Sequence, residues 1–279
     1  MSLRIIQGSI HKGLPQGTEE IIHGLNTYVI GNRTNPRATI VVYSDVFGLG
    51  LPNNKLIADS YAKSGEYLVY LPDFFEGDPV PVSVADTLIP VDAKNQSNFS
   101  WYTGVLASLP SFLVWSVKHT EGRTNKTCFD FLEKLRHATP LNHKIGMVGM
   151  CWGGKYAIRA AREQNRIELG GTQVPVVDAV VALHPSNLAL PADAEGIIIP
   201  TSIGWGLTDT FTKIELKGKI EDLQKQEKED GKKIAEAEHK VYEPGRHGFS
   251  VRGNPDDPEE KKILEDSVTH VLDFFKVHI

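Results

Sequence analysis

The stretch KIGMVGMCWGGKYAIRAA, residues 144–161, decides the fold of this 279-residue chain. Its first part is apolar enough for a buried strand, and its last part has the pattern of a helix. Between them, GMCWG at 149–153 has the form G-x-C-x-G, a sharp turn from strand to helix that requires glycine on both sides. The central residue of such a turn is strained and projects its side chain from the carboxyl edge of the sheet. The sequence therefore predicts that the Cys151 sulfur is presented there, beside a helix N-terminus.

Short β-branched runs alternate with longer helical patterns along the rest of the chain, which is typical of a mostly parallel sheet covered by helices on both faces. Several runs, such as TIVVY and DAVVAL, are continuously apolar, as expected for strands buried on both sides. The predicted strands cover 27–31, 39–45, 67–72, 144–150, 176–183, 197–204 and 238–242. The predicted helices cover 54–64, 124–137, 154–165, 213–230 and 258–277. We expect one α/β domain over 1–279, with a lid-like insertion at about 77–122.

The composition disfavours several classes of protein. A formal net charge of −5 argues against a nucleic acid or an anionic membrane as partner. The longest apolar stretch, 105–115, covers about half a bilayer and contains Pro110, so we expect no membrane-spanning segment. Two cysteines and an N-terminus without an apolar signal sequence favour a cytoplasmic protein. No His or Cys pair has metal-ligand spacing, so we expect no bound metal. We also expect no other cofactor. We expect the protein to be either a monomer or a homodimer.

A nucleophilic cysteine needs a base, and the base needs an acid that orients it. In enzymes built on this turn, these residues follow in the order nucleophile, acid, histidine. One predicted strand leads to Leu207-Thr208-Asp209, and the next leads to Arg246-His247-Gly248. Both side chains are therefore expected at the sheet edge that presents Cys151. We expect His247 to accept the thiol proton and Asp209 to fix the tautomer of the histidine.

Each assignment has an alternative. Cys151 could be a small core residue whose neighbouring glycines only pack a crossover. Asp209 could be a turn or cap residue, as aspartates in loops commonly are. His184 also follows a predicted strand and is the main rival of His247 as the base.

The motifs GMCWGG, GLTD and GRHGFSVRG, with HKGLPQGTEEIIHGLNTYVIG and VVYSDVFGLG upstream, resemble the dienelactone hydrolase family. The resemblance spans nearly the whole chain and is greatest to the fungal branch of the family. It implies an α/β-hydrolase fold and a cysteine hydrolase that cleaves small esters or enol-lactones through a thioester intermediate. Cys151, Asp209 and His247 stand at the positions of the family's catalytic residues.

The resemblance also implies supporting roles. Asp45, in SDVFG, matches an acidic residue that helps deprotonate the thiol in family members. Alternatively, it is a strand-end aspartate that binds local backbone. The backbone N–H groups of Val46 and Trp152 are expected to form the oxyanion hole.

The substrate itself is less constrained by the sequence. We expect it to contact His184, Phe249, Arg252, Trp101 and Phe74. Bacterial family members carry an arginine that binds the dienelactone carboxylate, whereas this chain has Glu76-Gly77-Asp78 at the aligned place. We therefore expect an uncharged or bulkier small-molecule ester or lactone. A thioesterase, another acyl hydrolase and a non-catalytic ligand-binding member of the fold are the alternatives.

Overall fold

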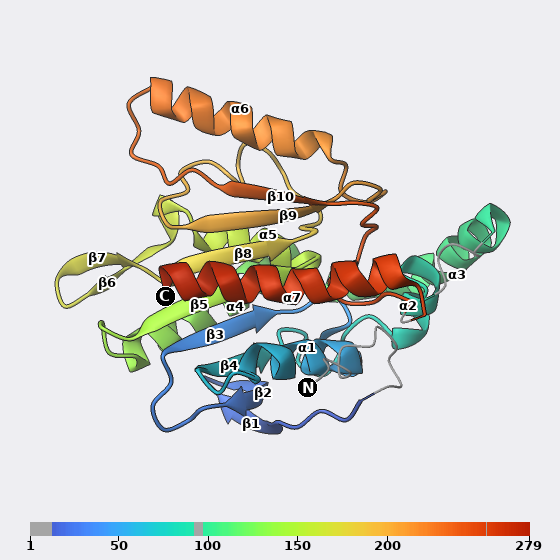
Figure 1. Cartoon of the computed structure of the whole chain (residues 1–279), viewed down its shortest axis with the longest axis horizontal. Helices are drawn as coiled ribbons and strands as arrows, with labels where there is room; N and C mark the ends of the chain where they lie inside the picture. The colour runs from blue at the N-terminus through green and yellow to red at the C-terminus, as the bar shows by residue number, and fades with distance from the viewer. Residues whose placement is uncertain (1–12, 92–96, 255) are drawn as a thin grey trace.

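The structure, a computed structural model, describes residues 13–91, 97–254 and 256–279. Its centre is an eight-stranded sheet in the order β1-β2-β4-β3-β5-β8-β9-β10 (Figure 1). In that order the strands span Thr18–Ile22, Leu25–Gly31, Tyr67–Pro72, Ala38–Tyr43, Lys144–Met150, Ala179–Leu183, Thr201–Gly206 and Glu238–Tyr242. From β4 to β10 all neighbours pair in parallel, and β2 pairs antiparallel with both β1 and β4. The predicted mostly parallel sheet is confirmed.

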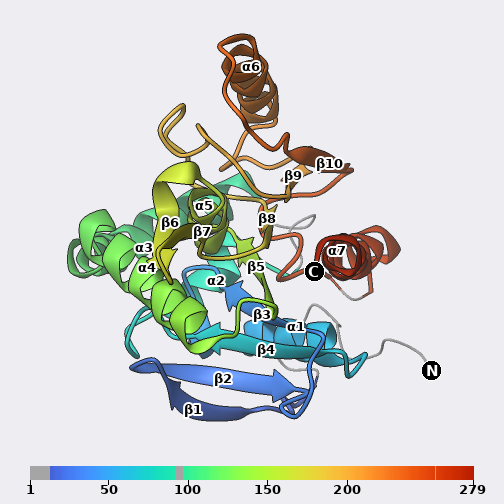
Figure 2. The ribbon, with the colours of Figure 1, turned by 90° about the vertical axis from the view of Figure 1, so that its left-hand side faces the viewer.

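Helices cover both faces of this sheet, as predicted. On one face lie α1 (Pro52–Ala62) and α7 (Pro258–His278), and on the other lie α4 (Glu121–Ala138) and α5 (Trp152–Ala160), as Figure 2 shows. A further helix, α6 (Glu215–Glu229), lies beyond the β10 edge of the sheet. Proline at the start of α1 and α7 fits a position where the backbone N–H has no helical acceptor.

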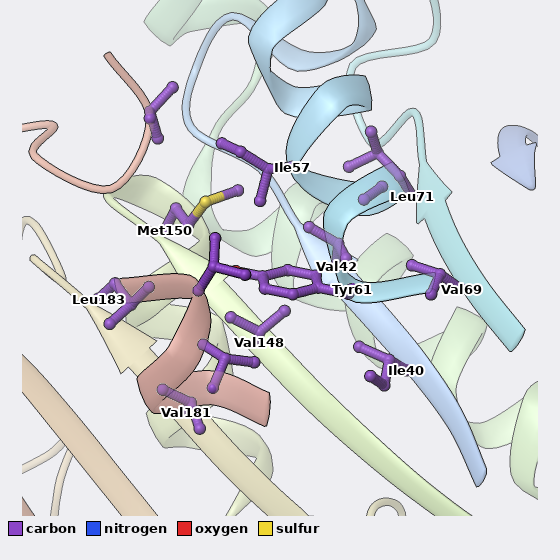
Figure 3. Packing of buried hydrophobic residues seen from close by; sticks show 14 of the residues in the cluster. Ile40, Val42, Ile57, Tyr61, Val69, Leu71, Val148, Met150, Val181 and Leu183 are labelled. Carbon is purple, nitrogen blue, oxygen red and sulfur yellow. The ribbon is translucent and has the colours of Figure 1, made fainter. Parts of the chain in front are cut away.

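Side chains alternate along the central strands between two buried clusters. Ile40 and Val42 of β3 pack in the cluster beneath α1 and α7, together with Val148 of β5 (Figure 3). Val41 and Tyr43 point to the opposite cluster, beneath α4 and α5. Because both faces of β3 are buried, the strand is continuously apolar, which is the physical origin of the TIVVY run.

The segment at about 77–122, expected as a lid-like insertion, is largely helical where the structure describes it, and its helices were not predicted. It contains α2 (Val82–Leu88) and α3 (Asn98–Lys118). In Figure 1, α3 projects from the sheet at the side where the carboxyl ends of the parallel strands lie. Its side chains include Phe99, Leu106 and Val117, which are 79%, 68% and 76% exposed. Among the described residues, no helix combines the length and apolar character needed to cross a membrane.

Other boundaries also differ from the predictions. Strand β1 was not predicted, nor was the hairpin of β6 (Arg166–Leu169) and β7 (Thr172–Pro175). The helix predicted over 154–165 ends at Ala160, and a short 3₁₀ turn follows it at Glu163–Asn165. Another 3₁₀ turn, at Gly48–Gly50, precedes α1. The hairpin turns at two adjacent glycines with positive φ, a conformation that helices exclude.

Candidate active site

Cys151 occupies the turn between β5 and α5, with φ 53° and ψ −113°. These angles lie in a region that residues with a side chain rarely adopt. The flanking glycines are required by close backbone packing. A Cβ atom on Gly149 would lie 2.2 Å from the Gly153 carbonyl oxygen, and one on Gly153 would lie 2.1 Å from the Tyr43 carbonyl oxygen. The predicted glycine requirement of this turn is therefore confirmed.

His247 and Asp209 lie in the loops that follow β10 and β9, at the same sheet edge as Cys151. The His247 Nε2 atom is 3.2 Å from the Cys151 Sγ atom, and its Nδ1 atom is 2.8 Å from Asp209 Oδ2. The other carboxylate oxygen, Oδ1, accepts the N–H groups of Phe211 and Thr212, both at 2.8 Å. Asp209 is thus a turn residue and also fixes the orientation of the His247 ring.

The electrostatics of this cluster favour a charged His247 ring. Burial by itself would lower the pKa of His247, but the neighbouring Cys151 sulfur and the Asp209 carboxylate outweigh burial and raise that pKa to about 10. The sulfur also lies at the N-terminus of α5, where the helix dipole stabilises negative charge. The arrangement is therefore suited to a thiolate beside an imidazolium.

The two amides expected to bind an oxyanion come from separate segments of the chain. Val46 lines the same cavity as Cys151, and Trp152 opens α5 directly after it. Within the part of the chain that the structure describes, neither backbone N–H has a hydrogen-bond acceptor. The elbow is tied to the end of β3 by a 3.1 Å bond from the Gly153 N–H to the Ser44 carbonyl oxygen. Both amides are therefore available to a substrate oxygen.

Asp45 is buried at the end of β3 and faces the cavity with Cys151. Its Oδ1 atom accepts the Phe47 N–H at 3.0 Å and the Asn54 side-chain amide at 2.9 Å. Its Oδ2 atom has no hydrogen-bond partner among the described residues. Burial raises the pKa of this carboxyl to about 6, against the opposing effects of those two donors and of the charges of His247 and Arg252. Asp45 thus binds local backbone through one oxygen and keeps the other unpaired.

His184, the alternative candidate for the base, packs against the ring of His247. The His184 ring is fully buried, and its Nε2 atom is 2.7 Å from the Ser250 hydroxyl. Burial and the neighbouring charge of His247 keep its pKa well below the ordinary value. The hydroxyl closest to the sulfur belongs instead to Ser186, whose Oγ atom is 3.5 Å from Sγ. Ser186 was not predicted, although it follows the same strand as His184.

The other residues expected to contact substrate are mostly placed elsewhere. Phe249 is buried against His184, with 4.9 Å between their ring centroids. Arg252 is buried and forms a 2.6 Å ion pair with Asp86. Phe74 packs against Tyr43, at a centroid distance of 4.1 Å. Trp101 belongs to α3, and its side chain is outside the described part of the structure.

A cavity of about 130 Å³ opens beside the Cys151 sulfur. Most of its wall is apolar; Leu88 at the end of α2, the adjoining Ile89 and Phe112 within α3 contribute to it. The lining residues are Asp45, Val46, Phe47, Leu88, Ile89, Phe112, Cys151, His184, Ser186, Phe211, His247 and Gly248. Among these described residues there is no lysine or arginine. The apolar members, Leu88, Ile89, Phe112 and Phe211, were not predicted as site residues.

The sequence model of the dienelactone hydrolase family matches residues 25–279, nearly the whole chain. The chain belongs to the dienelactone hydrolase family. A curated relative of this family member, the hydrolase pyvD of Aspergillus violaceofuscus, is 27% identical over 98% of this chain and 95% of its own length. The carboxymethylenebutenolidase homologue of Xenopus tropicalis is 22% identical over 95% of this chain and 92% of its own.

Solved structures agree with this family membership at the level of the fold. A putative dienelactone hydrolase from Klebsiella pneumoniae superposes with a TM-score of 0.57 at 14% identity, covering 93% of this chain and 97% of that one. The α/β-hydrolase fold is therefore confirmed. As a member of the dienelactone hydrolase family, the chain has the characteristics of a hydrolase that acts on small esters or lactones.

Proposed function

We propose that this family member hydrolyses small esters or lactones with Cys151 as nucleophile, through a thioester acyl-enzyme. The observation that supports this most strongly is the continuous line of contacts from Asp209 through His247 to the Cys151 sulfur, with distances of 2.8 Å and 3.2 Å. Such a line orients the base, and it allows the base to exchange a proton with both the nucleophile and the leaving group. Because both buried clusters pack on one sheet, we propose that the chain works as a single domain.

In the proposed reaction, the Cys151 thiolate attacks the carbonyl carbon of the substrate. The carbonyl oxygen takes up negative charge and is bound by the Val46 and Trp152 N–H groups. As the carbon–oxygen bond of the ester breaks, His247 donates its proton to the leaving oxygen, which stays attached to the acyl group if the substrate is a lactone. Neutral His247 then takes a proton from water, hydroxide attacks the thioester, and the thiolate and imidazolium are regenerated.

Asp45 is proposed as an auxiliary proton acceptor. Asp45 lines the cavity, its Oδ2 atom has no hydrogen-bond partner among the described residues, and a pKa of about 6 makes this carboxylate a stronger base than an ordinary aspartate. A Cys151 sulfur that is protonated when substrate enters can lose its proton to that oxygen, and the charge of His247 then holds the thiolate.

The cavity favours an uncharged substrate of modest size. Its volume of about 130 Å³ is close to that of cavities that accept one benzene ring. Glu76 and Asp78 contribute little repulsion toward an anionic substrate, because Glu76 pairs with Arg123 and Asp78 pairs with Lys118. The preference instead follows from the apolar wall and from the absence of lysine and arginine among the described lining residues. A thioester of the same shape remains a possible substrate, and the experiment below includes one.

The experiment is a burst assay with 4-nitrophenyl acetate, matched with an uncharged lactone and a thioester. The wild-type protein should release one equivalent of nitrophenol quickly and gain the mass of one acetyl group on the peptide that carries Cys151. Cys151→Ala should lose both signals, whereas Cys128→Ala should keep both, because Cys128 is buried and burial raises its pKa well above the ordinary value. Full hydrolysis by Cys151→Ala would contradict the proposal.

A further inference from the structure

The hydroxyl of Ser186 is the only side-chain oxygen among the described residues recorded within hydrogen-bonding distance of the Cys151 sulfur. The two atoms, Oγ and Sγ, are 3.5 Å apart, within the range for hydrogen bonds to sulfur. Ser186 is half-buried and lines the cavity that contains Cys151. A serine hydroxyl can rotate, so it can donate its proton to a thiolate or accept a bond from a thiol.

The loop that carries Ser186 is held rigidly on both sides. The Ser186 N–H donates to the Cys151 carbonyl oxygen at 2.9 Å, which ties the loop to the elbow. On the other side, the Thr212 hydroxyl donates to the Pro185 carbonyl oxygen at 2.8 Å, and the Thr212 N–H donates to Asp209. The loop therefore connects the nucleophile to the acid that orients the base.

Two non-glycine residues in this loop have positive φ angles. They are 38° at His184 and 55° at Asn187, on either side of the Pro185-Ser186 pair. Such conformations cost energy, and they persist where the surrounding contacts require them. Here they turn the chain sharply after β8, so that the Ser186 hydroxyl reaches the sulfur.

Several charged or titratable groups face the sulfur besides Ser186. His247 lies 3.2 Å away and supplies positive charge, and His184 lines the cavity as a neutral ring. Asp45 lines the same cavity, and its carboxylate disfavours a second negative charge on the sulfur. The positive charge of Arg252 partly offsets this effect of Asp45. A thiolate at Cys151 therefore depends on its hydrogen-bond donors, and a donor beyond His247 has a measurable effect.

We propose that Ser186 is the second hydrogen-bond donor to the Cys151 thiolate, in addition to His247, and that it stabilises the charged nucleophile before substrate binds. This inference rests on the proposed function of Cys151. With two donors, the sulfur keeps one orientation toward the cavity while the Val46 and Trp152 amides stay free for the substrate oxygen. As the sulfur bonds to the substrate carbon, it loses its negative charge and the Ser186 bond weakens.

The test measures the rate at which iodoacetamide alkylates Cys151 between pH 4 and pH 10, followed by peptide mass spectrometry. The wild type, Ser186→Ala and Ser186→Thr are compared, and thermal melting establishes that each variant is folded. In Ser186→Ala, we expect the midpoint of the alkylation profile to rise by about one pH unit, since a hydrogen bond to a charged group has an effect of this order. Alkylation below the midpoint should then slow by about tenfold, with the plateau at high pH unchanged. Ser186→Thr, which keeps the hydroxyl, should retain the wild-type midpoint.

A Ser186→Ala profile that superposes on that of the wild type would overturn the inference, as would a lowered plateau with an unchanged midpoint, which indicates a merely structural role. Alkylation reports the thiolate and does not depend on hydrolysis. If Cys151→Ala hydrolyses esters normally while Ser186→Ala still shifts the midpoint, the proposed function fails and the Ser186 bond stands. If Cys151→Ala is inactive and the midpoint of Ser186→Ala does not move, the proposed function stands and the inference about Ser186 fails.

Discussion

The imidazole ring of His184 stands edge-on to that of His247, with 5.2 Å between their centroids and 69° between their planes. His184 is fully buried and held by Ser250, and its lowered pKa keeps it neutral while its neighbour carries charge. The two histidines therefore differ in role although both follow strands. His247 contacts the sulfur directly, and His184 supports the ring of His247 from behind.

This difference predicts unequal effects of two matched substitutions. His247→Ala should lower kcat by about three to four orders of magnitude, as loss of a base in a hydrogen-bonded cluster does elsewhere. His184→Ala leaves the proton transfers intact and should lower kcat by about tenfold or less, through a looser His247 ring. Steady-state kinetics with an aryl ester provide the measurement. A larger loss in His184→Ala than in His247→Ala would show that the base has been assigned wrongly.

Much of this site could be predicted because it depends on chain order. Cys151, Asp209 and His247 each follow a strand of a parallel sheet, so their proximity follows from topology alone. Ser186 and Phe112 reach the cavity through the path of a strained loop and the packing of α3, neither of which leaves a periodic signal in the sequence.

The helices of the insertion were missed for a different physical reason. Helix α3 contains Pro110 and Gly104, and Lys118 at its end is its only charged residue, so no charged face alternates with its apolar residues. Without that alternation, the usual helical periodicity is absent. Strand β1 is short and partly exposed at the sheet edge, where burial does not impose an apolar pattern.

Asp45→Asn is expected to change both turnover and the pH dependence of stability. Turnover should fall, because an amide cannot accept the thiol proton. Since burial raises the pKa of Asp45 from 3.8 to about 6, the folded protein binds this proton more tightly than the unfolded chain does. The stabilising contribution of this carboxyl is therefore lost as the pH rises from about 4 to about 6.

Asparagine removes that titration. The difference in Tm, variant minus wild type, should increase across this pH range and then level off. Calorimetry at intervals of half a pH unit measures it, and a difference that stays flat between pH 4 and pH 7 would contradict the raised pKa. Asn54 donates to the same carboxylate, so Asn54→Ala should increase the pKa of Asp45 further and move the effect to higher pH.

A neutral lactone or aryl ester should be hydrolysed with a higher kcat/KM than a dienelactone that carries a carboxylate. The apolar cavity wall has no cation to bind that carboxylate among the described lining residues. Because Glu76 and Asp78 are paired with cations, this preference should persist at 1 M salt, where surface repulsion is screened. Parallel kinetics at low and high salt provide the measurement. If the carboxylated lactone is preferred by tenfold or more, Arg252 and Arg246 are the first residues to substitute.

Stability in acid should depend on His270, a residue of α7 that does not line the cavity. Its ring nitrogens bind the Ser202 hydroxyl and the Tyr242 hydroxyl, each at 2.8 Å. Burial lowers the pKa of His270 from 6.5 to about 4, with a further contribution from the charge of Lys240. The stabilisation is therefore present above pH 6.5 and is lost as the pH falls toward 4.

His270→Gln tests this dependence. The variant should melt at a lower temperature than the wild type at pH 7.5, and the gap should narrow as the pH approaches 4. The exposed His137, substituted in the same way, is the control and should give a gap that does not vary in this manner. A His270→Gln gap that is constant from pH 7.5 to pH 4 would refute the prediction.

The positive φ at Cys151 has a consequence for anyone who tries to make this protein more heat-resistant. A left-handed conformation that costs a side-chain-bearing residue about 1–3 kcal/mol costs glycine almost nothing. Relief of backbone strain at position 151 therefore favours a residue that has no nucleophile. Directed evolution that selects for survival of heating alone would be drawn toward glycine there and would yield a robust, inactive scaffold. Selection for hydrolysis in every round is what would keep the cysteine in place.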